Sequence, residues 1–219
     1  PAWLSAIGIG PEVGANKRII VGGIVFSVVL MLTVSVLLFR SEIARIREAK
    51  ATRASIMGEI PDFSLVNQAG MMIGRSDLLG RVNLVSFVYT RCTGPCPTLS
   101  KQMAQLYSDW VTLPDIQFVT ITVDPDFDQP DVLAVYAQSY GADPERWHFL
   151  TGERERVYDL VRNGFRASIE DSDTPHGILH NQRFALVDRK GRIRAYLDGE
   201  SEDLRTAVRP VLKRLLAEN

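Results

Sequence analysis

Cys92 and Cys96 are the two cysteines of this 219-residue chain and its most chemically capable side chains. They lie in the stretch TRCTGPCP, residues 90–97, with three residues between them and a proline directly after the second. Such a pair can form a structural disulfide, exchange electrons as a dithiol, or bind a metal ion as thiolates. The rest of the sequence bears on the choice among these three.

Each use of the cysteine pair makes a different demand on the chain. A disulfide would close a loop of only about five residues, which constrains the unfolded chain far less than a long-range bridge does. Redox exchange motifs usually place two residues between the cysteines, so the spacing weakens that analogy without excluding it. A metal ion other than linear Cu(I) would need at least one further donor.

The three histidines are the candidates for that further donor. His148, in RWHFL, is flanked by apolar residues and is typical of a satisfied core histidine. His176 and His180 are four residues apart, but the proline and glycine beside His176 indicate a loop, which disfavours a helical histidine pair. His180 stands just before an apolar run that can return to the central sheet, so it is the better third ligand.

The cysteines must be positioned by the elements on either side of them. Residues 82–90 are a nearly unbroken β-branched and aromatic run, which predicts a strand buried on both faces of a sheet. After the cysteines, an apolar stripe at helical spacing predicts a helix that packs on the core through Leu99, Met103, Leu106, Tyr107 and Trp110. Pro97 fits the first turn of that helix, which places both sulfurs near its positive end, where thiolate is favoured.

The other predicted elements alternate along the chain. They are a hairpin at 62–67 and 71–75, a buried strand at 116–123, a helix that carries Leu133, Tyr136 and Tyr140, a short strand at 147–150, a helix at 154–165, a strand pair at 183–188 and 193–199 with its turn at Lys190 and Gly191, and a last helix from about Glu202. This order predicts a three-layer α/β domain. Functional groups in such sheets gather at the carboxyl ends of the strands, where the cysteines are expected.

A membrane anchor is predicted in front of this domain. Residues 19–39 contain no charge and no proline and are long enough to cross ~30 Å of hydrocarbon as a helix. A cleaved signal peptide is the competing interpretation, because Ala49–Ala51 loosely imitates a cleavage site, but the apolar run is longer than such signals have. The resulting domains are a tail at 1–18, a transmembrane helix at 19–39, a polar helical stalk at 40–58 and the globular domain at 59–219.

Composition and charge exclude some functions and complicate the topology. Hydrophobic residues make up 46% of the chain, charged residues 23%, and the formal net charge is −1. No sustained basic stripe is present, so nucleic acid is not an expected partner. Basic residues are more numerous after the apolar run than before it, and the positive-inside rule alone would therefore put the large domain in the cytoplasm.

Three separated motifs resemble the Sco/SenC family, the copper-binding proteins that help to assemble cytochrome c oxidase. They are FVYTRCTGPCP at 87–97, VTITVDPDFDQP at 119–130 and LHNQRFALVDRKGRI at 179–193. The resemblance extends from Ile60 to about Leu215 behind a single anchor helix. Thr93 departs from the family, in which proline is frequent after the first cysteine, and this departure concerns only the shape of the loop.

The resemblance implies a thioredoxin-like fold with one copper ion, Cu(I) or Cu(II), bound by Cys92, Cys96 and His180. It implies a membrane-anchored copper chaperone for the dinuclear copper site of oxidase subunit II, in contact with the bilayer and with other copper chaperones or a respiratory complex. The protein would be a single-pass inner-membrane protein with its domain on the periplasmic or mitochondrial intermembrane-space side. That location conflicts with the charge tally, and we follow the family.

Two acidic residues of the second motif are further candidates. Asp124 ends a predicted strand at the edge where the cysteines lie, and it is predicted to orient a metal ligand by accepting a hydrogen bond. Asp128 stands two residues before Pro130 and is predicted to be the N-cap of the next helix rather than a functional residue.

Other functions stay open from the sequence. Cys92 and Cys96 could be the catalytic, redox-active pair of a metal-independent thiol–disulfide oxidoreductase that acts on the oxidase cysteines. The chain could also be a resident accessory subunit of a respiratory complex, or, more remotely, a peroxidase. A metallochaperone is favoured over an enzyme, and the sequence does not decide between transfer of a metal ion and transfer of electrons.

Overall fold

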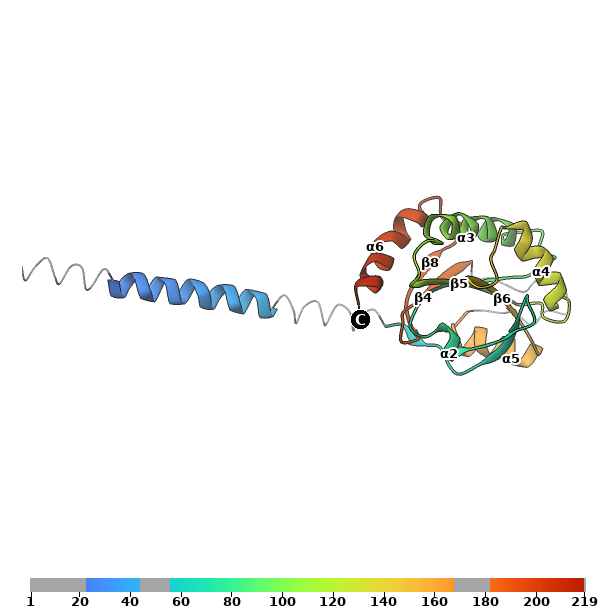
Figure 1. Ribbon diagram of the computed structural model, residues 1–219, viewed down its shortest axis with the longest axis horizontal. Coiled ribbons are helices and arrows are strands. Elements are labelled where there is room, and N and C mark those ends of the chain that lie inside the picture. The colour runs from blue at the N-terminus through green and yellow to red at the C-terminus, as the bar shows by residue number, and fades with distance from the viewer. Residues whose placement is uncertain (1–22, 44–55, 168–181, 219) are drawn as a thin grey trace, which may run out of the picture. The chain divides into compact units, whose positions relative to one another are not determined.

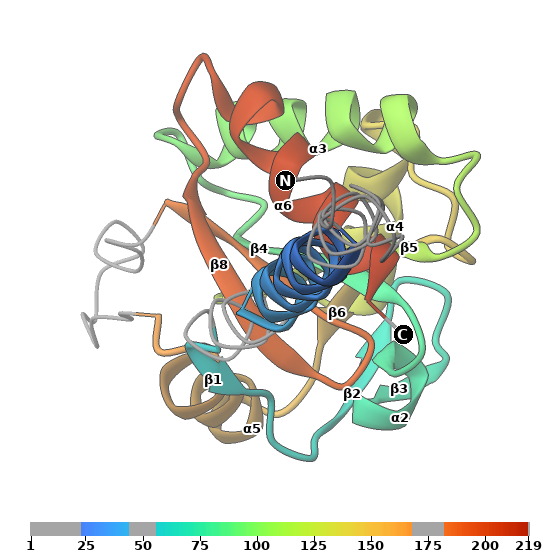
Figure 2. The ribbon, with the colours of Figure 1, turned by 90° about the vertical axis from the view of Figure 1, so that its left-hand side faces the viewer.

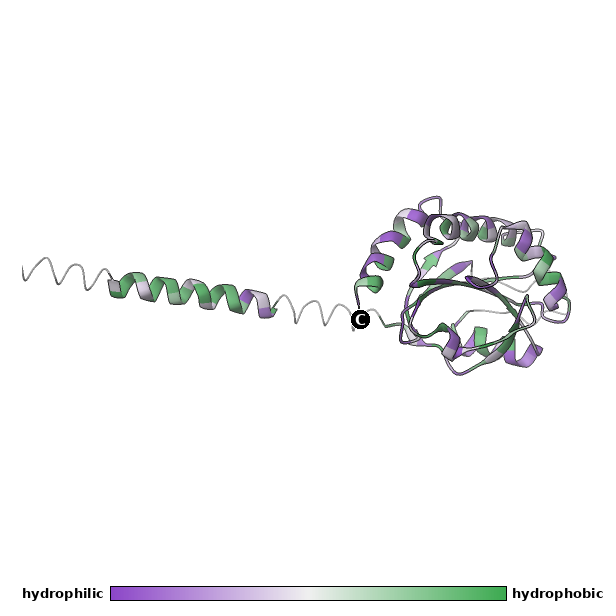
Figure 3. Ribbon diagram, viewed as in Figure 1, coloured by the Kyte–Doolittle hydropathy of each residue, from purple (hydrophilic) through white to green (hydrophobic). Residues whose placement is uncertain are grey.

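The computed structural model describes residues 23–43, 56–167 and 182–218, and the chain divides into two compact units, Pro1–Ala54 and Ser55–Asn219. The described part of the first unit is one helix, Gly23–Ile43. Figure 3 shows hydrophobic residues along almost its whole length, and their side chains are exposed. This helix is long and apolar enough to cross a membrane, so it is a candidate membrane span that overlaps the predicted one.

The second unit is built on an eight-stranded sheet. In sheet order the strands are β1 (Gly58–Glu59), β8 (Arg192–Asp198), β7 (Arg183–Val187), β4 (Val82–Val88), β5 (Ile116–Thr122), β6 (Trp147–Thr151), β2 (Ser64–Asn67) and β3 (Met72–Gly74). Strands β4, β5 and β6 are parallel, and all other neighbours are antiparallel. Figure 2 shows β1 and β8 toward one edge of the sheet and β2 and β3 toward the other.

Helices cover both faces of this sheet. On one face lie α3 (Cys96–Trp110), α4 (Pro130–Ser139) and α6 (Leu204–Ala217), and on the other lie α2 (Arg75–Leu78) and α5 (Arg154–Asp159) (Figure 1). The predicted three-layer α/β order is therefore confirmed. Because both faces are covered, every residue of the central strands β4 and β5 is buried, including polar ones such as Asn83, Ser86 and Gln117.

The centre of the core is the parallel pair of β4 and β5. Every residue of both strands is buried, and the register runs from Val82 opposite Ile116 to Val88 opposite Thr122 without a shift. The two strands consequently end at the same edge of the sheet. The apolar stripe predicted for the following helix is also confirmed, because all five of its residues are buried on α3.

Two short elements, β1 and α2, were not predicted. Elements of two to four residues are too short to show a hydrophobic period, so their sequences carry little signal. The helix predicted at 154–165 is α5 continued by a five-residue π-helical segment, Leu160–Gly164. The β7–β8 turn was predicted correctly: Gly191 adopts a φ of 78°, the left-handed conformation that glycine accepts most readily.

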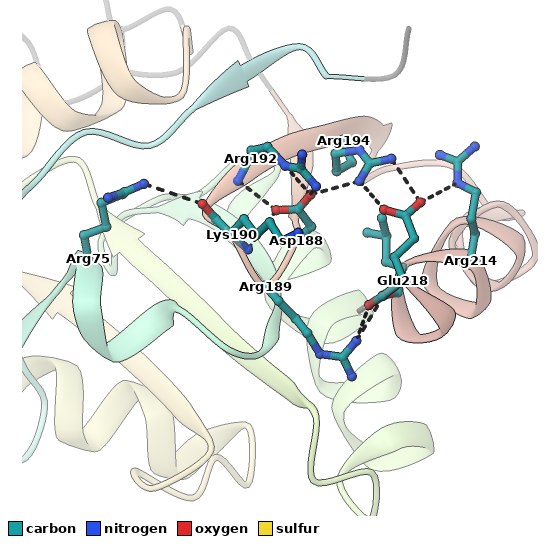
Figure 4. A network of polar contacts seen from close by, with 9 residues as sticks. Arg75, Asp188, Arg189, Lys190, Arg192, Arg194, Arg214 and Glu218 are labelled. Atoms are coloured by element: carbon teal, nitrogen blue, oxygen red, sulfur yellow. Dashed lines mark hydrogen bonds and ion pairs between the residues drawn. The ribbon is translucent and has the colours of Figure 1, made fainter. Parts of the chain in front are cut away.

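A buried ion-pair network fastens the C-terminal helix to the sheet (Figure 4). The Arg194 side chain on β8 is fully buried, and its Nη1 donates to Asp188 Oδ2 at 2.9 Å and to Glu218 Oε2 at 2.6 Å. Its Nη2 donates to Glu218 Oε1 at 3.1 Å. Arg189 donates to the last carbonyls of α6, including that of Glu218 at 2.9 Å, so the end of the helix is held by two arginines.

Removal of Arg194 should strongly destabilise the domain. The Arg194→Met variant leaves two carboxylates near the sheet without their buried partner, and such a loss typically costs about 3–5 kcal/mol. Urea unfolding of the full chain in mild detergent, followed by tryptophan fluorescence, measures the change.

The matched control is Arg154→Met, which removes an exposed ion pair with Asp126. Exposed pairs contribute about 0–1 kcal/mol, so this variant should unfold close to the wild type. Equal losses of stability in the two variants would contradict the conclusion that the Arg194 network holds α6 against the sheet.

Candidate functional site

The cysteines lie at the carboxyl edge of the central strand, as predicted. Strand β4 ends at Val88, and α3 begins at Cys96 with Pro97 as its second residue. Cys92 lies in the connecting loop, where its backbone N–H donates to the carbonyl of Tyr89 at 3.2 Å. The helix therefore begins at one sulfur, and the loop brings the other sulfur near the same positive helix end.

Both cysteines are reduced and largely buried. Cys92 is 8% exposed and Cys96 is 1% exposed, whereas Thr93 and Gly94 between them are exposed. A Cβ atom added at Gly94 would lie 3.9 Å from Cys92 Sγ, so the backbone of this exposed residue passes close to the sulfur.

The two thiols differ in acidity because their surroundings differ. Burial opposes ionisation of Cys92, but hydrogen bonds from the Cys96 thiol, from the backbone N–H groups of Cys96 and Gly94 and from the Tyr89 hydroxyl outweigh it and lower the pKa of Cys92. Burial and the hydrogen bond to Cys92 raise the pKa of Cys96 well above its usual range. One thiol is thus prepared to be a thiolate while its neighbour holds the proton.

Tyr89 is a site residue that the sequence did not reveal. Burial, together with its hydrogen bond and proximity to Cys92, raises the pKa of Tyr89 to about 12. The phenol therefore stays protonated at neutral pH and can donate to the Cys92 sulfur. A tyrosine inside an apolar strand run looks like a core residue, so only its distance of three positions from Cys92 hinted at this contact.

Asp124 is brought to the cysteine loop through Arg91, the residue before Cys92. Arg91 Nη2 and Nε donate to Asp124 Oδ2 at 2.6 and 3.1 Å, and the guanidinium also stacks 4.1 Å from the ring centroid of Phe127. The hydrogen bonds found for this carboxylate within the described residues hold the loop rather than a cysteine. Its predicted role in orienting a metal ligand stays a prediction.

Asp128 is not the helix cap that the sequence predicted. The N-cap of α4 is Gln129, and Pro130 begins the helix. The Asp128 side chain is fully buried and accepts hydrogen bonds from Thr90 and Thr122. Burial raises the pKa of Asp128 despite these hydrogen bonds. The prediction failed because the distance along the chain to Pro130 does not show that the turn folds back onto the strands.

His148 is a core histidine, as its apolar neighbours predicted. It is 5% exposed, with Nδ1 3.4 Å from the amide nitrogen of Asn67 and Nε2 2.6 Å from that of Gln117. Both ring nitrogens already face buried side chains of neighbouring strands. Burial lowers the pKa of His148, which keeps the ring neutral.

The third donor predicted for a metal site lies outside the described residues. His180 and His176 both fall in 168–181, so the structure does not test them as ligands. Among the described residues, no three histidine, cysteine, aspartate or glutamate side chains gather as a set that could hold a metal ion. What the described part of the site offers is two neighbouring thiols, the soft donors that suit Cu(I), Zn(II) and iron–sulfur clusters.

Comparisons with known proteins give this loop and sheet a context. The family model described as SCO1/SenC matches residues 51–216. A SCO1 protein homolog of Bacillus subtilis (strain 168) is 27% identical over 137 residues, which cover 62% of this chain and 71% of that protein. The crystal structure of a SCO1/SenC family lipoprotein from Bacillus anthracis aligns with a TM-score of 0.68 and 29% identity over 74% of this chain and 96% of that one.

A third relative carries copper. The structure of Bradyrhizobium japonicum ScoI with copper bound aligns with a TM-score of 0.57 and 24% identity, over 72% of this chain and 99% of that one. At this identity, the likeness shows the common fold.

The buried His148 should make stability fall in mild acid. Its pKa is lower in the folded chain than the usual ~6.5 of an unfolded chain. Above about pH 6.5 the His148 ring is neutral in both the folded and the unfolded chain, and its contribution to the free energy of unfolding is complete. As the pH falls through the folded pKa, the unfolded chain binds the proton more readily than the folded chain does, so this contribution is lost. The His148→Gln variant should therefore lose less of its urea midpoint between pH 7 and pH 5 than the wild type loses.

The control for this experiment is His176→Gln, which removes a histidine of the predicted loop. Its urea midpoint should follow the wild-type pH dependence. A His148→Gln midpoint that falls in parallel with the wild type would show that His148 does not titrate on unfolding.

Proposed function

The chain belongs to the SCO1/SenC family, and we propose on that premise that it is a membrane-anchored copper chaperone that binds one copper ion through Cys92, Cys96 and His180. The observation that carries the proposal is the pair of reduced thiols at the start of α3, with the pKa of Cys92 lowered by four hydrogen-bond donors. Thiolates and a neutral imidazole form a donor set that suits Cu(I), and a further donor would accommodate Cu(II).

The topology supports His180 as the third donor. Strand β7 begins three residues after His180 and pairs antiparallel with β4, with Ala185 opposite Val85. The start of β7 therefore lies toward the carboxyl end of β4, the end from which the cysteine loop leaves. The described strand that follows His180 in the sequence therefore starts at the edge of the sheet where the cysteine loop leaves β4, which supports the choice of His180.

The expected recipient of the copper is cytochrome c oxidase, because proteins of this family are assembly factors of that enzyme. We propose the dinuclear copper site of subunit II as the target and the periplasmic or intermembrane-space side as the location of the domain. The helix Gly23–Ile43 would be the anchor, with the residues between it and β1 as the link to the domain. The basic residues from Arg40 to Arg53 are interleaved with Glu42 and Glu48, which weakens the contrary tally of charges.

A second candidate function rests on the same two sulfurs. The unequal acidities of Cys92 and Cys96 suit a thiol–disulfide oxidoreductase, in which one thiolate attacks and its neighbour resolves the mixed disulfide. This activity would reduce the cysteines of the oxidase before copper enters. It needs no histidine, and this requirement separates it from the copper site.

Copper binding should depend on all three proposed ligands. The full chain, reduced and in mild detergent, is titrated with Cu(I) against a chromogenic chelator, and the wild type should retain one equivalent. The Cys92→Ser, Cys96→Ser and His180→Ala variants should each bind more weakly by more than the roughly 10–100-fold that loss of an outer-sphere partner costs.

The control is His176→Ala, which removes the neighbouring histidine of the same segment and should bind like the wild type. Copper retention by His180→Ala equal to that of the wild type would eliminate the three-ligand site.

Oxidase assembly in cells should separate the two candidate functions. A strain deficient in this assembly step is complemented with wild type, Cys92→Ser or His180→Ala, and the copper content of the purified oxidase is measured. For a copper donor, both variants should leave the oxidase deficient in copper. Full copper content with His180→Ala and a deficiency with Cys92→Ser would favour the thiol–disulfide oxidoreductase instead. A resident accessory subunit would, in addition, co-purify with the oxidase in equal amount.

A further inference from the structure

The segment between β5 and α4 forms one tight turn, residues 124–128. The backbone N–H groups of Phe127 and Asp128 both donate to the carbonyl of Asp124, at 3.1 and 2.9 Å. The Gln129 side chain donates to the Pro125 carbonyl at 2.7 Å and closes the turn from the other side. This geometry brings the Asp128 side chain back to the ends of β4 and β5.

Asp128 ties these two strand ends together. Its Oδ2 accepts from the Thr90 backbone N–H at 3.1 Å and from the Thr122 hydroxyl, and its Oδ1 accepts from the Thr90 hydroxyl. The side chain is 0% exposed. A buried carboxylate is costly unless its oxygens are well satisfied, and here all three donors come from the ends of the strands that frame the site.

Thr90 is the point at which β4 becomes the cysteine loop. The Val123 N–H donates to the Val88 carbonyl at 2.9 Å and is the last backbone hydrogen bond between the strands at this edge among the described residues. After this hydrogen bond, Asp128 accepts a hydrogen bond from Thr90 and Asp124 accepts one from Arg91. The two carboxylates of one turn therefore bind the two residues before Cys92.

The far side of the loop is fixed by the helix. The Leu99 N–H donates to the Pro95 carbonyl at 3.0 Å, which places Cys96 in the first turn of α3. Between these anchors, Thr93 and Gly94 are exposed. The N–H groups of Gly94 and Cys96 donate to the Cys92 sulfur from the helix side of the loop, whereas Thr90 and Arg91 hold the chain before Cys92 on the strand side.

We propose that Asp128 is a positioning residue for the cysteine pair: by holding Thr90, it fixes Cys92 against the start of α3 and so sets the dithiol–disulfide equilibrium of Cys92 and Cys96. The thiol part of this inference stands on the geometry, and its extension to the retention of copper rests on the proposed function.

The direction of the effect follows from the chemistry of the pair. Oxidation forms the Cys92–Cys96 bond and releases two protons and two electrons, which oxidised dithiothreitol takes up as it becomes the dithiol. The hydrogen bonds to the Cys92 sulfur stabilise the reduced form of the protein. A loosened loop weakens these hydrogen bonds, so the disulfide becomes relatively more stable and the pair becomes more reducing.

The test compares two threonines that bind the same carboxylate. Thr90→Val removes the hydroxyl on the cysteine strand, Thr90→Ser keeps it, and Thr122→Val removes the hydroxyl on β5. The full chain in mild detergent is equilibrated with dithiothreitol buffers. Thr90→Val and Asp128→Asn should shift the equilibrium constant about tenfold toward the disulfide, or about 30 mV, whereas Thr90→Ser should stay within about twofold of the wild type. Thr122→Val leaves both contacts of Asp128 with Thr90 in place but also removes the acceptor of the Asp124 N–H, so it should shift the equilibrium constant less than Thr90→Val does.

A purely structural role gives a different pattern. If Thr90→Val and Thr122→Val lower the urea midpoint alike and leave the equilibrium constant unchanged, the inference is overturned. If Asp128→Asn does not fold, the comparison of Thr90→Val with Thr90→Ser decides alone, because a shift in the first that is absent from the second supports the positioning role.

The outcomes also separate this inference from the proposed function. Cu(I) titration of the wild type serves that purpose. A wild type that retains no copper removes the proposed function, while a shifted equilibrium in Thr90→Val still supports the role of Asp128. Copper retention together with an unshifted equilibrium overturns only the inference.

Discussion

The buried parallel pairing of β4 and β5 is the constraint on which the site depends. Its register keeps the strands in step to Val88 and Thr122, so both end at one edge of the sheet. The cysteine loop must leave β4 there, and the acidic turn must leave β5 there. The approach of Asp124 and Asp128 to the residues before Cys92 follows from this geometry, and the hydrogen bonds to Arg91 and Thr90 then make it specific.

The difference in acidity between the two thiols would serve the proposed copper site. A metal ion binds thiolates, so binding would have to displace the proton that burial retains on Cys96. That proton would compete with the metal for the Cys96 sulfur, which suits a site that gives up its metal more than one that stores it. Cys92, in contrast, has its pKa lowered and is the sulfur better prepared to meet an incoming ion or an incoming disulfide.

Much of the fold was predictable because its central elements carry strong patterns. Long apolar runs predicted β4 and β5, and helical periodicity predicted α3, so the position of the cysteines between strand and helix followed. The contacts of Asp128 and Arg91 were not predictable, because they depend on which side chains meet when two strand ends come together. The proposed donor His180 lies outside the described residues, and its role rests on the sequence and on the position of β7.

Access to the sulfurs does not distinguish transfer of copper from transfer of electrons. Both reactions need the partner to reach the Cys92 sulfur, and the two residues that follow Cys92, Thr93 and Gly94, are exposed. The two reactions differ in what they require from the segments on either side of β4 in the sheet. On one side, the turn after β5 holds the loop, which serves either reaction. On the other side, the segment before β7 would add an imidazole, which only the metal requires, so the choice between the two functions depends on that neighbour of β4.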